Sequence, residues 1–194
     1  MFVLGHLGIG SFLAARRVRA TQLAWLLFGA VLPDLVDKPL YYALVVATGR
    51  RGAELGLVSG TRTFGHTLLF AVALWIVVPR RIGTPLFLGI ATHLLLDQLG
   101  DVAWWIFPAL GTHAPPGTIS AILFPLLGPH FPVSPYHSAL EHMRSLENAY
   151  VIAGEAIGAA LLVWQWRTGV FDGLRRRAPA EKAALGGTPR PSRP

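Results

Sequence analysis

Long apolar runs separated by short basic or Pro- and Gly-rich breaks run through this chain. The runs that predict helices cover residues 2–15, 23–32, 64–79, 85–99 and 136–166. The third is about 24 Å long at 1.5 Å per residue, slightly short for a bilayer core. Pro33 follows the second run and disfavours helix at the residue before it, so the second helix should break there. We therefore predict an all-α bundle of about five membrane spans with a broken second helix.

Composition agrees with a membrane protein. Only 14% of the 194 residues are charged and 53% are hydrophobic, whereas soluble domains have about 25% charged residues. A net charge of +7 raises nucleic-acid binding as an interpretation. The basic residues lie at the ends of apolar runs, however, where topology signals occur, so no nucleic-acid partner is expected. Cysteine is absent, which excludes disulfides and thiol catalysis. Residues 1–170 are expected to form one membrane-embedded domain, and the basic, Pro- and Ala-rich residues 171–194 a disordered tail.

Basic residues also predict the orientation, because they favour the cytoplasmic side. One arrangement, with the N-terminus outside, five spans and the C-terminus inside, accounts for Arg16, Arg17, Arg19, Arg80, Arg81, Arg167, Arg175, Arg176 and Arg177. The loop with Arg50, Arg51 and Arg62 is an exception, since it would lie outside. The expected location is the cell (inner) membrane, with several passes.

His93 and Asp97 form the most informative polar pair, because they lie four residues apart inside an apolar run. On a helix they share one face, and both are costly there unless something satisfies them. A metal ion would do so, since imidazole and carboxylate are both zinc ligands. A structural His–Asp hydrogen bond between packed helices is the alternative. His137 and Glu141 repeat the spacing, and His142 is expected on another face.

The predicted topology brings the suspect residues to one level of the bundle, near its outer face. Scattered structural polar residues would not do this, so we predict a metal site there. Its candidate ligands are His6, Asp34, His66, His93, Asp97, His137 and Glu141. Taken singly, His6 could be a solvated terminal residue and Asp34 a helix cap.

Four motifs resemble the YdjM-like family, whose members are described as inner-membrane metal-dependent hydrolases. They are Gly5-His6, Leu32-Pro33-Asp34-x-x-Asp37, the segment 62–69 (Arg-Thr-Phe-Gly-His-Thr-Leu-Leu) and His93-x-x-x-Asp97, and the resemblance covers roughly residues 1–110. It implies metal-site roles for His6, Asp34, His66, His93 and Asp97. The spacing to Asp37 is one residue longer than in the family, and only Arg62 remains of an upstream His-Arg pair. A more distant similarity to zinc-dependent phospholipase C and related nucleases adds His137 and Glu141.

Together these features predict a membrane-bound hydrolase that holds one or more divalent ions, with zinc preferred. A metal-activated water would cleave a phosphoester of a lipid or lipid-linked substrate taken from the bilayer. Asp37 is a candidate general base or positioning partner of a ligand, and Arg62 and Arg144 are candidates to hold an anionic head group. The alternatives are an ion or solute transporter, and a scaffold without catalysis and without stoichiometric metal.

Overall fold

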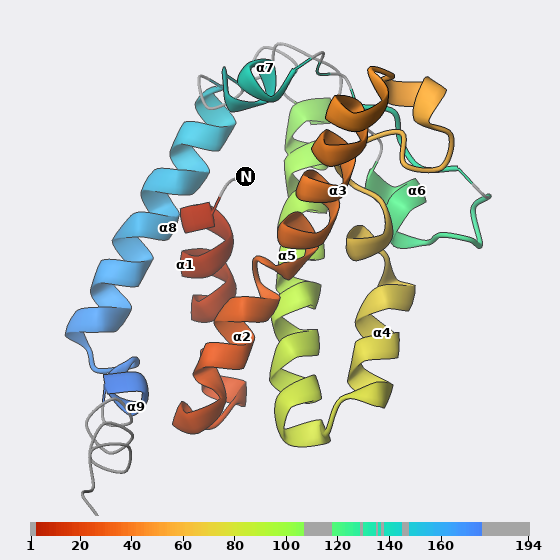
Figure 1. The fold of residues 1–194 in the computed structure, drawn as a ribbon. Helices are drawn as coiled ribbons and strands as arrows, with labels where there is room; N and C mark the ends of the chain where they lie inside the picture. Colours follow the sequence, from red (N-terminus) through yellow and green to blue (C-terminus); the bar gives the residue numbers. More distant parts are fainter. Residues whose placement is uncertain are drawn as a thin grey trace, which may run out of the picture.

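A computed structural model describes residues 3–106, 118–128, 130–134, 136, 138–144 and 148–175, and all regular structure in this part of the chain is helical (Figure 1). The all-α prediction is confirmed. The α-helices are α1 Val3–Ala14, α2 Leu23–Gly29, α3 Leu32–Thr48, α4 Leu68–Val77, α5 Arg80–Ile106, α6 Thr118–Ile122, α7 Ala139–Arg144, α8 Ala149–Arg167 and α9 Asp172–Arg175. Short 3-10 turns, η1 Ala15–Arg17, η2 Ala20–Gln22, η3 Gly52–Leu55 and η4 Phe64–His66, lie between them.

Helix α5 is the longest of the described elements and runs almost the full height of the bundle, with α2 on one side and α4 on the other, while α3 lies over its upper half in the view of Figure 1. Its 27 residues extend about 40 Å. Pro85 lies inside it and has no N–H to donate to the carbonyl of Arg81. The side-chain amide of Gln22 donates to that carbonyl instead, at 2.8 Å. This contact compensates the proline and ties η2 to the start of α5.

Glycines allow two pairs of helices to cross at very short distance. Where α1 crosses α8, a Cβ added to Gly8 would lie 1.9 Å from the carbonyl oxygen of Gly158. Where α2 crosses α5, a Cβ on Gly89 would lie 2.2 Å from the carbonyl oxygen of Leu26. Small residues four positions apart on one helix, such as Gly154 and Gly158, are typical of packed membrane helices. These crossings place the start of α1 beside α8 and the helix break after α2 beside α5.

The predicted break of the second helix is confirmed. Helix α2 ends at Gly29, and α3 begins at Leu32 with Pro33 in its first turn. Pro33 lacks the N–H that would continue the first helix but suits the start of the next one. The break leaves Ala30 and Val31 between the two helices, facing α5 at the level of the site.

The prediction of one helix over residues 64–79 is wrong in its first part. Residues Phe64–His66 form a 3-10 turn, and α4 begins only at Leu68. Thr67 is extended, and its hydroxyl accepts a hydrogen bond from the Phe70 N–H at 2.9 Å, which makes it the N-cap of α4. Threonine is a preferred capping residue because its oxygen satisfies an orphan donor of the first turn.

The single helix predicted over residues 136–166 is also wrong. The structure has α7 and α8 there, and Asn148 is extended with its side chain accepting from the Tyr150 N–H at 2.8 Å. Asn148 therefore begins a new helix. Glu141 and Glu155, which one helix over residues 136–166 would contain together, therefore lie on two different helices.

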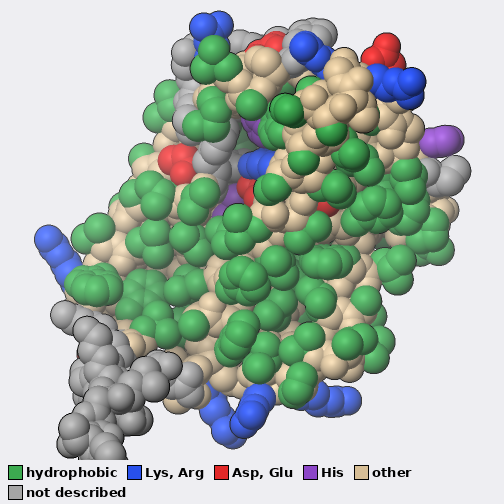
Figure 2. Space-filling view, viewed as in Figure 1, with side chains coloured by type: hydrophobic (Ala, Val, Ile, Leu, Met, Phe, Trp, Pro, Cys, Tyr) green, Lys and Arg blue, Asp and Glu red, His purple; other side chains and the backbone are tan. Residues whose placement is uncertain are grey.

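Two helices of the described residues, within Arg80–Ala103 and Ala149–Arg167, are long and apolar enough to cross a membrane, and α4 is shorter. The count of five spans therefore stays a prediction. The outer surface is nevertheless rich in apolar side chains, with Val46 86% exposed and Val77 80% exposed. Figure 2 shows a broad hydrophobic surface with Lys and Arg side chains at both ends of the molecule. A bilayer would cover such a surface.

The folded chain extends beyond the predicted domain end at residue 170. Phe171 is only 6% exposed and packs with Ala14, Leu23 and Leu26, and α9 follows it. Residues 171–175, which the prediction assigned to the tail, are thus part of the described structure. Residues 176–194 lie outside the described part, so the tail stays a prediction.

The close crossing of α1 and α8 generates a stability prediction. In Gly158→Leu the new Cβ would meet the carbonyl oxygen of Leu4 at 2.2 Å, and overpacking of this kind costs about 1–3 kcal/mol or more. We expect a clearly lower Tm in detergent, measured by thermal denaturation. Ala156→Leu, at an exposed position of the same helix, is the control and should leave Tm nearly unchanged. Equal Tm values for both variants would contradict the tight crossing.

Candidate metal centre

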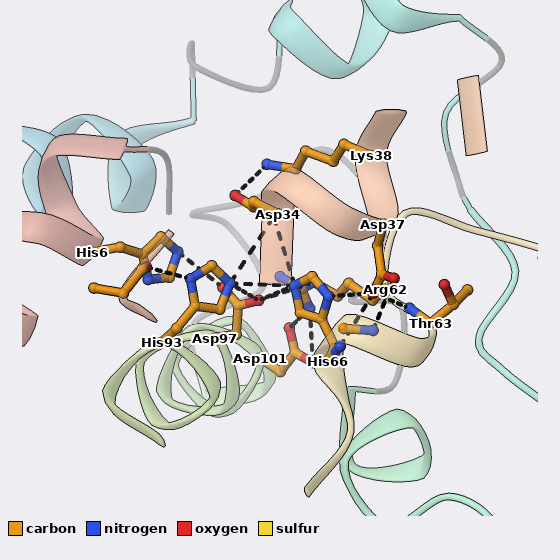
Figure 3. Close-up of polar contacts among 12 residues, drawn as sticks. His6, Asp34, Asp37, Lys38, Arg62, Thr63, His66, His93, Asp97 and Asp101 are labelled. Atoms are coloured by element: carbon orange, nitrogen blue, oxygen red, sulfur yellow. Dashed lines mark hydrogen bonds and ion pairs between the residues drawn. The ribbon is translucent and has the colours of Figure 1, made fainter. Parts of the chain in front are cut away.

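Five of the seven predicted ligands meet beside α5 (Figure 3). They come from different elements: His6 from α1, Asp34 from α3, His66 from η4, and His93 and Asp97 from α5. The three imidazoles are at most 1% exposed, and Asp97 is 3% exposed. Asp34 and His93 combine with His6 in one potential metal-ligating group, and His66, His93 and Asp97 form another.

His66 and His93 face each other through their Nε2 atoms, which are 3.2 Å apart. On the far side of His93, Nδ1 lies 2.8 Å from the carbonyl oxygen of Ala30. A carbonyl can only accept, so Nδ1 carries the proton. His66 Nδ1 lies 2.7 Å from Asp37 Oδ2 and is protonated for the same reason. When both rings are neutral, each Nε2 atom therefore carries a lone pair. Two lone pairs that face each other need a cation or a proton between them.

Two carboxylates complete a set of four donor atoms around this point. Asp97 Oδ2 lies 3.5 Å from His66 Nε2 and 3.6 Å from His93 Nε2. Asp34 Oδ1 lies 3.6 Å and 4.0 Å from the same two nitrogens. A tetrahedral zinc ion with bonds of about 2.0–2.2 Å places its ligand atoms about 3.3–3.6 Å apart. The separations among His66 Nε2, His93 Nε2 and Asp97 Oδ2 are close to those values, so these three atoms could hold one ion, with Asp34 Oδ1 as a more distant fourth donor.

The ring of His6 lies against a flat face of the His93 ring. Their rings are stacked, with centroids 3.8 Å apart and planes at 15°. His6 Nε2 is 3.4 Å from Asp97 Oδ1, yet neither ring nitrogen of His6 makes a hydrogen bond. His6 is thus the one imidazole of the three whose ring no hydrogen bond orients.

Asp37 organises the segment that carries His66. Its carboxylate accepts backbone N–H bonds from Thr63 (2.7 Å), Gly65 (2.9 Å) and His66 (3.1 Å), as well as the bond from the His66 ring. Gly65 permits this approach, because a Cβ there would lie 2.9 Å from the Pro33 carbonyl oxygen. Both oxygens of Asp37 are occupied by donors, so of its two predicted roles the contacts favour positioning of His66 over general-base catalysis.

Arg62 is held by two carboxylates of α5. Its Nε lies 3.3 Å from Asp97 Oδ2, and its Nη1 lies 3.1 Å from Asp101 Oδ1. We had not predicted Asp101, although its position four residues after Asp97 puts it on the same helix face. Lys38, also not predicted, lies 2.6 Å from Asp34 Oδ2, again at a spacing of four.

In the part of the chain that the structure describes, carboxylates outnumber the lysine and arginine cations around the four donor atoms. Four carboxylates, of Asp34, Asp37, Asp97 and Asp101, face two cations, Lys38 and Arg62. With neutral imidazoles the cluster therefore carries two excess negative charges in a largely buried setting. Uncompensated buried charge is strongly unfavourable, and one divalent cation would neutralise it.

Two of the remaining predicted residues, Glu141 and Arg144, do not join this cluster. His137 lies outside the described residues. Glu141 is in the first turn of α7, where its N–H donates to the Ser138 hydroxyl, and Arg144 is exposed at the end of that helix. The structure brings neither of these two to the four donor atoms.

The neighbouring His142, which we expected to be incidental, makes specific contacts near the cluster. Its Nδ1 lies 2.8 Å from the Tyr42 hydroxyl, and its ring stacks on Tyr136 with centroids 4.6 Å apart. Burial, and then the positive charge of Lys38, lower the pKa of His142 from 6.5 to about 4. The imidazole is therefore neutral at neutral pH.

The comparison with known families fits this arrangement. The sequence profile described as YdjM inner membrane protein matches residues 1–168. The chain belongs to the YdjM inner membrane protein family. The resemblance is thereby confirmed and extends beyond the expected residue 110, through α8 of this YdjM protein. The family also supports the predicted location in the inner membrane, in contact with the lipid bilayer. No curated protein and no solved structure matches the chain.

The contacts of Asp37 generate a second stability prediction. Asp37→Ala leaves three buried N–H groups and the His66 ring without their acceptor, and each unsatisfied buried donor costs about 1–3 kcal/mol. We expect a large loss of stability, measured as Tm in detergent. Glu54→Ala removes a carboxylate that accepts from the Arg51 N–H on the exposed surface and should change Tm little. Similar effects of the two substitutions would contradict the organising role of Asp37.

Proposed function

We propose that this YdjM protein is a membrane-bound metal-dependent hydrolase that cleaves a phosphoester of a lipid or lipid-linked substrate by a metal-activated water. The observation that carries the proposal is the pair of facing ring nitrogens, His66 Nε2 and His93 Nε2, which lie 3.2 Å apart while each Nδ1 is bonded to an acceptor. The carboxylates of Asp97 and Asp34 lie around them at the separations expected of metal ligands.

The surroundings of the two imidazoles support metal binding over a structural hydrogen bond. Ligating histidines usually donate their other N–H to a carboxylate or a backbone carbonyl, which fixes the tautomer and the ring. His66 does so to Asp37, and His93 to Ala30. A structural His–Asp hydrogen bond would need a closer contact than the 3.6 Å between His93 Nε2 and Asp97 Oδ2. Nitrogen and oxygen donors near tetrahedral spacing favour zinc.

The chain's own residues suggest how a phosphoester would be held. A divalent ion would lower the pKa of a bound water to about 7 and stabilise charge on a phosphoryl oxygen. Asp34 is the most open of the four donors, with a side chain 16% exposed against 4% for Asp97. It is therefore the donor most accessible to a substrate.

Two cations border the same donors and suit an anionic substrate. The side chains of Lys38 and Arg62 are 26% and 20% exposed. Ammonium and guanidinium groups both bind phosphate oxygens. We assign the head-group role to this pair, which retains the predicted Arg62 and replaces Arg144 by Lys38.

The position of the site supports a lipid substrate. Figure 2 shows histidine, basic and acidic side chains together in a recess, with hydrophobic side chains around it. An amphiphile could place its head group in such a recess while its chains stay in lipid.

We further propose several membrane passes with the site near the outer face. Helix α1 runs from His6 toward Arg16, and α5 runs from Arg80 toward His93. Arginines at the end opposite the site favour the cytoplasm for that end.

The transporter alternative has less support. It would use Glu155, an acid within a candidate span, as part of an ion path. Glu155 instead accepts the N–H groups of Leu4 and Gly5 at 2.9 Å and 3.0 Å, in the first turn of α1. These are the contacts of a helix-capping residue.

Elemental analysis of purified protein tests the metal centre. We expect stoichiometric divalent metal, with zinc preferred, in the wild type and its loss in His93→Ala and Asp97→Ala. Leu95→Ala, an exposed position between them on α5, is the control and should keep its metal. Unchanged metal content in both ligand variants would refute the centre.

Assays of phosphoester cleavage with zinc-loaded protein and phospholipid in mixed micelles test the activity. We expect turnover by the wild type and by Leu95→Ala, and at least about 100-fold less by His93→Ala, because the activated water depends on the ion. A metal-containing wild type that releases neither a phosphorylated head group nor another hydrolysis product would favour the scaffold alternative.

A further inference from the structure

His6 is the part of the cluster that a single metal ion leaves unexplained. It is 1% exposed, and neither of its nitrogens makes a hydrogen bond. Buried ring nitrogens without partners are rare, because each has lost its bonds to water. His66 and His93 each have a hydrogen-bonded Nδ1, and their Nε2 atoms face each other at the proposed position of the first ion. His6 stacks on His93 and lies to one side of that group.

Asp97 offers a different oxygen to each side of the cluster. Its Oδ2 lies near His66, His93 and Arg62 at 3.3–3.6 Å. Its Oδ1 is 3.4 Å from His6 Nε2, the same spacing that relates the donors of the first ion. A carboxylate with both oxygens placed in this way can bridge two cations.

Asp34 is the third residue available on the His6 side. His6, Asp34 and His93 together form a group with one potential ligand atom each, all within 4.8 Å. His93 cannot serve a separate ion through Nδ1, because that nitrogen donates to Ala30. The donors left for His6 to share are therefore the carboxylates of Asp34 and Asp97.

We propose that His6 holds a second divalent cation, with Asp97 Oδ1 and Asp34, and that Asp97 bridges it to the first. This inference rests on the proposed hydrolase centre. The first ion cancels the two excess negative charges of the cluster, and the second makes the site positive. A phosphate group would bind favourably to such a site, because two-metal centres stabilise both oxygens of a phosphoryl displacement.

Glu155 is the positioning residue for this second site. Its carboxylate binds the N–H groups of Leu4 and Gly5, directly before His6. Negative charge is also favourable at a helix N-terminus. Because no hydrogen bond orients the His6 ring, its position depends on the start of α1, and hence on α8.

Metal stoichiometry and manganese EPR test the proposal. We expect two ions per chain in the wild type and an exchange-coupled Mn²⁺ signal. His6→Gln should bind one ion and show the six-line signal of a single Mn²⁺. Ser11→Ala, a buried position of α1 whose hydroxyl bonds only within that helix, should keep two coupled ions.

Glu155 supplies a second set of variants that leaves every ligand in place. Glu155→Leu should weaken the second ion about 10–100-fold, as loss of supporting contacts does at other metal sites, while the first ion is retained. Glu155→Gln should restore part of the affinity, since its amide oxygen can accept one of the two bonds. Equal loss of both ions in Glu155→Leu would contradict the positioning role.

The outcomes separate the two proposals. One uncoupled ion in both the wild type and His6→Gln would overturn the second site and leave the single-metal hydrolase standing. No bound ion in the wild type would overturn both. If His6→Gln does not fold, the wild-type spectrum decides, because an uncoupled signal excludes a carboxylate-bridged pair.

Discussion

Two imidazoles whose Nε2 atoms face each other inside an apolar bundle are the constraint on which the rest of this structure depends. The Nε2 atoms of His66 and His93 are 3.2 Å apart, and each ring is fixed from behind by an acceptor. The acceptor for His93 is the carbonyl of Ala30, exposed by the break between α2 and α3. The acceptor for His66 is Asp37, in the second turn of α3. The proline that breaks the helix thus supports both histidines.

The segment that carries Arg62 and His66 is irregular, and its order comes from contacts on both sides. Asp37 holds the N–H groups of Thr63, Gly65 and His66. On the outer side, Ser59 accepts the Ser134 N–H at 3.0 Å and its hydroxyl donates to the Phe131 carbonyl. Phe64 packs edge-on against Phe131 at 5.1 Å. Irregular backbone within a membrane protein is tolerated where the protein, and not lipid, satisfies its polar groups.

The interior of this small bundle holds a polar cluster, whereas its outer surface is apolar, and the packing of the helices has to allow both. Glycines bring α1 to α8 and α2 to α5 at backbone contact, which leaves room at one level for the side chains of the cluster. The same crossing lets Glu155 reach the start of α1. The geometry of the site and the packing of the helices are therefore coupled.

The sequence by itself determined the features that depend on local chemistry. The apolar runs indicated helices and a membrane location, Pro33 indicated the break, and the spacing of His93 and Asp97 indicated a shared helix face. The predicted topology placed Asp34, His66 and His6 at the same level, the family resemblance agreed, and the structure brings all five side chains together. The same spacing of four relates Asp101 to Asp97 and Lys38 to Asp34, but we did not apply it to those two residues.

Only the tertiary structure decided what depends on contacts between distant segments. The late start of α4 follows from Thr67 as a cap, and the split of α7 from α8 follows from Asn148. Neither residue outweighs an apolar run when periodicity alone is considered. The position of Asp37 behind His66 and the contact of Glu155 with α1 join residues 29 and about 150 positions apart. Hydrogen bonds of this kind depend on which face each helix presents to its neighbours, and the order of residues along the chain does not contain that information.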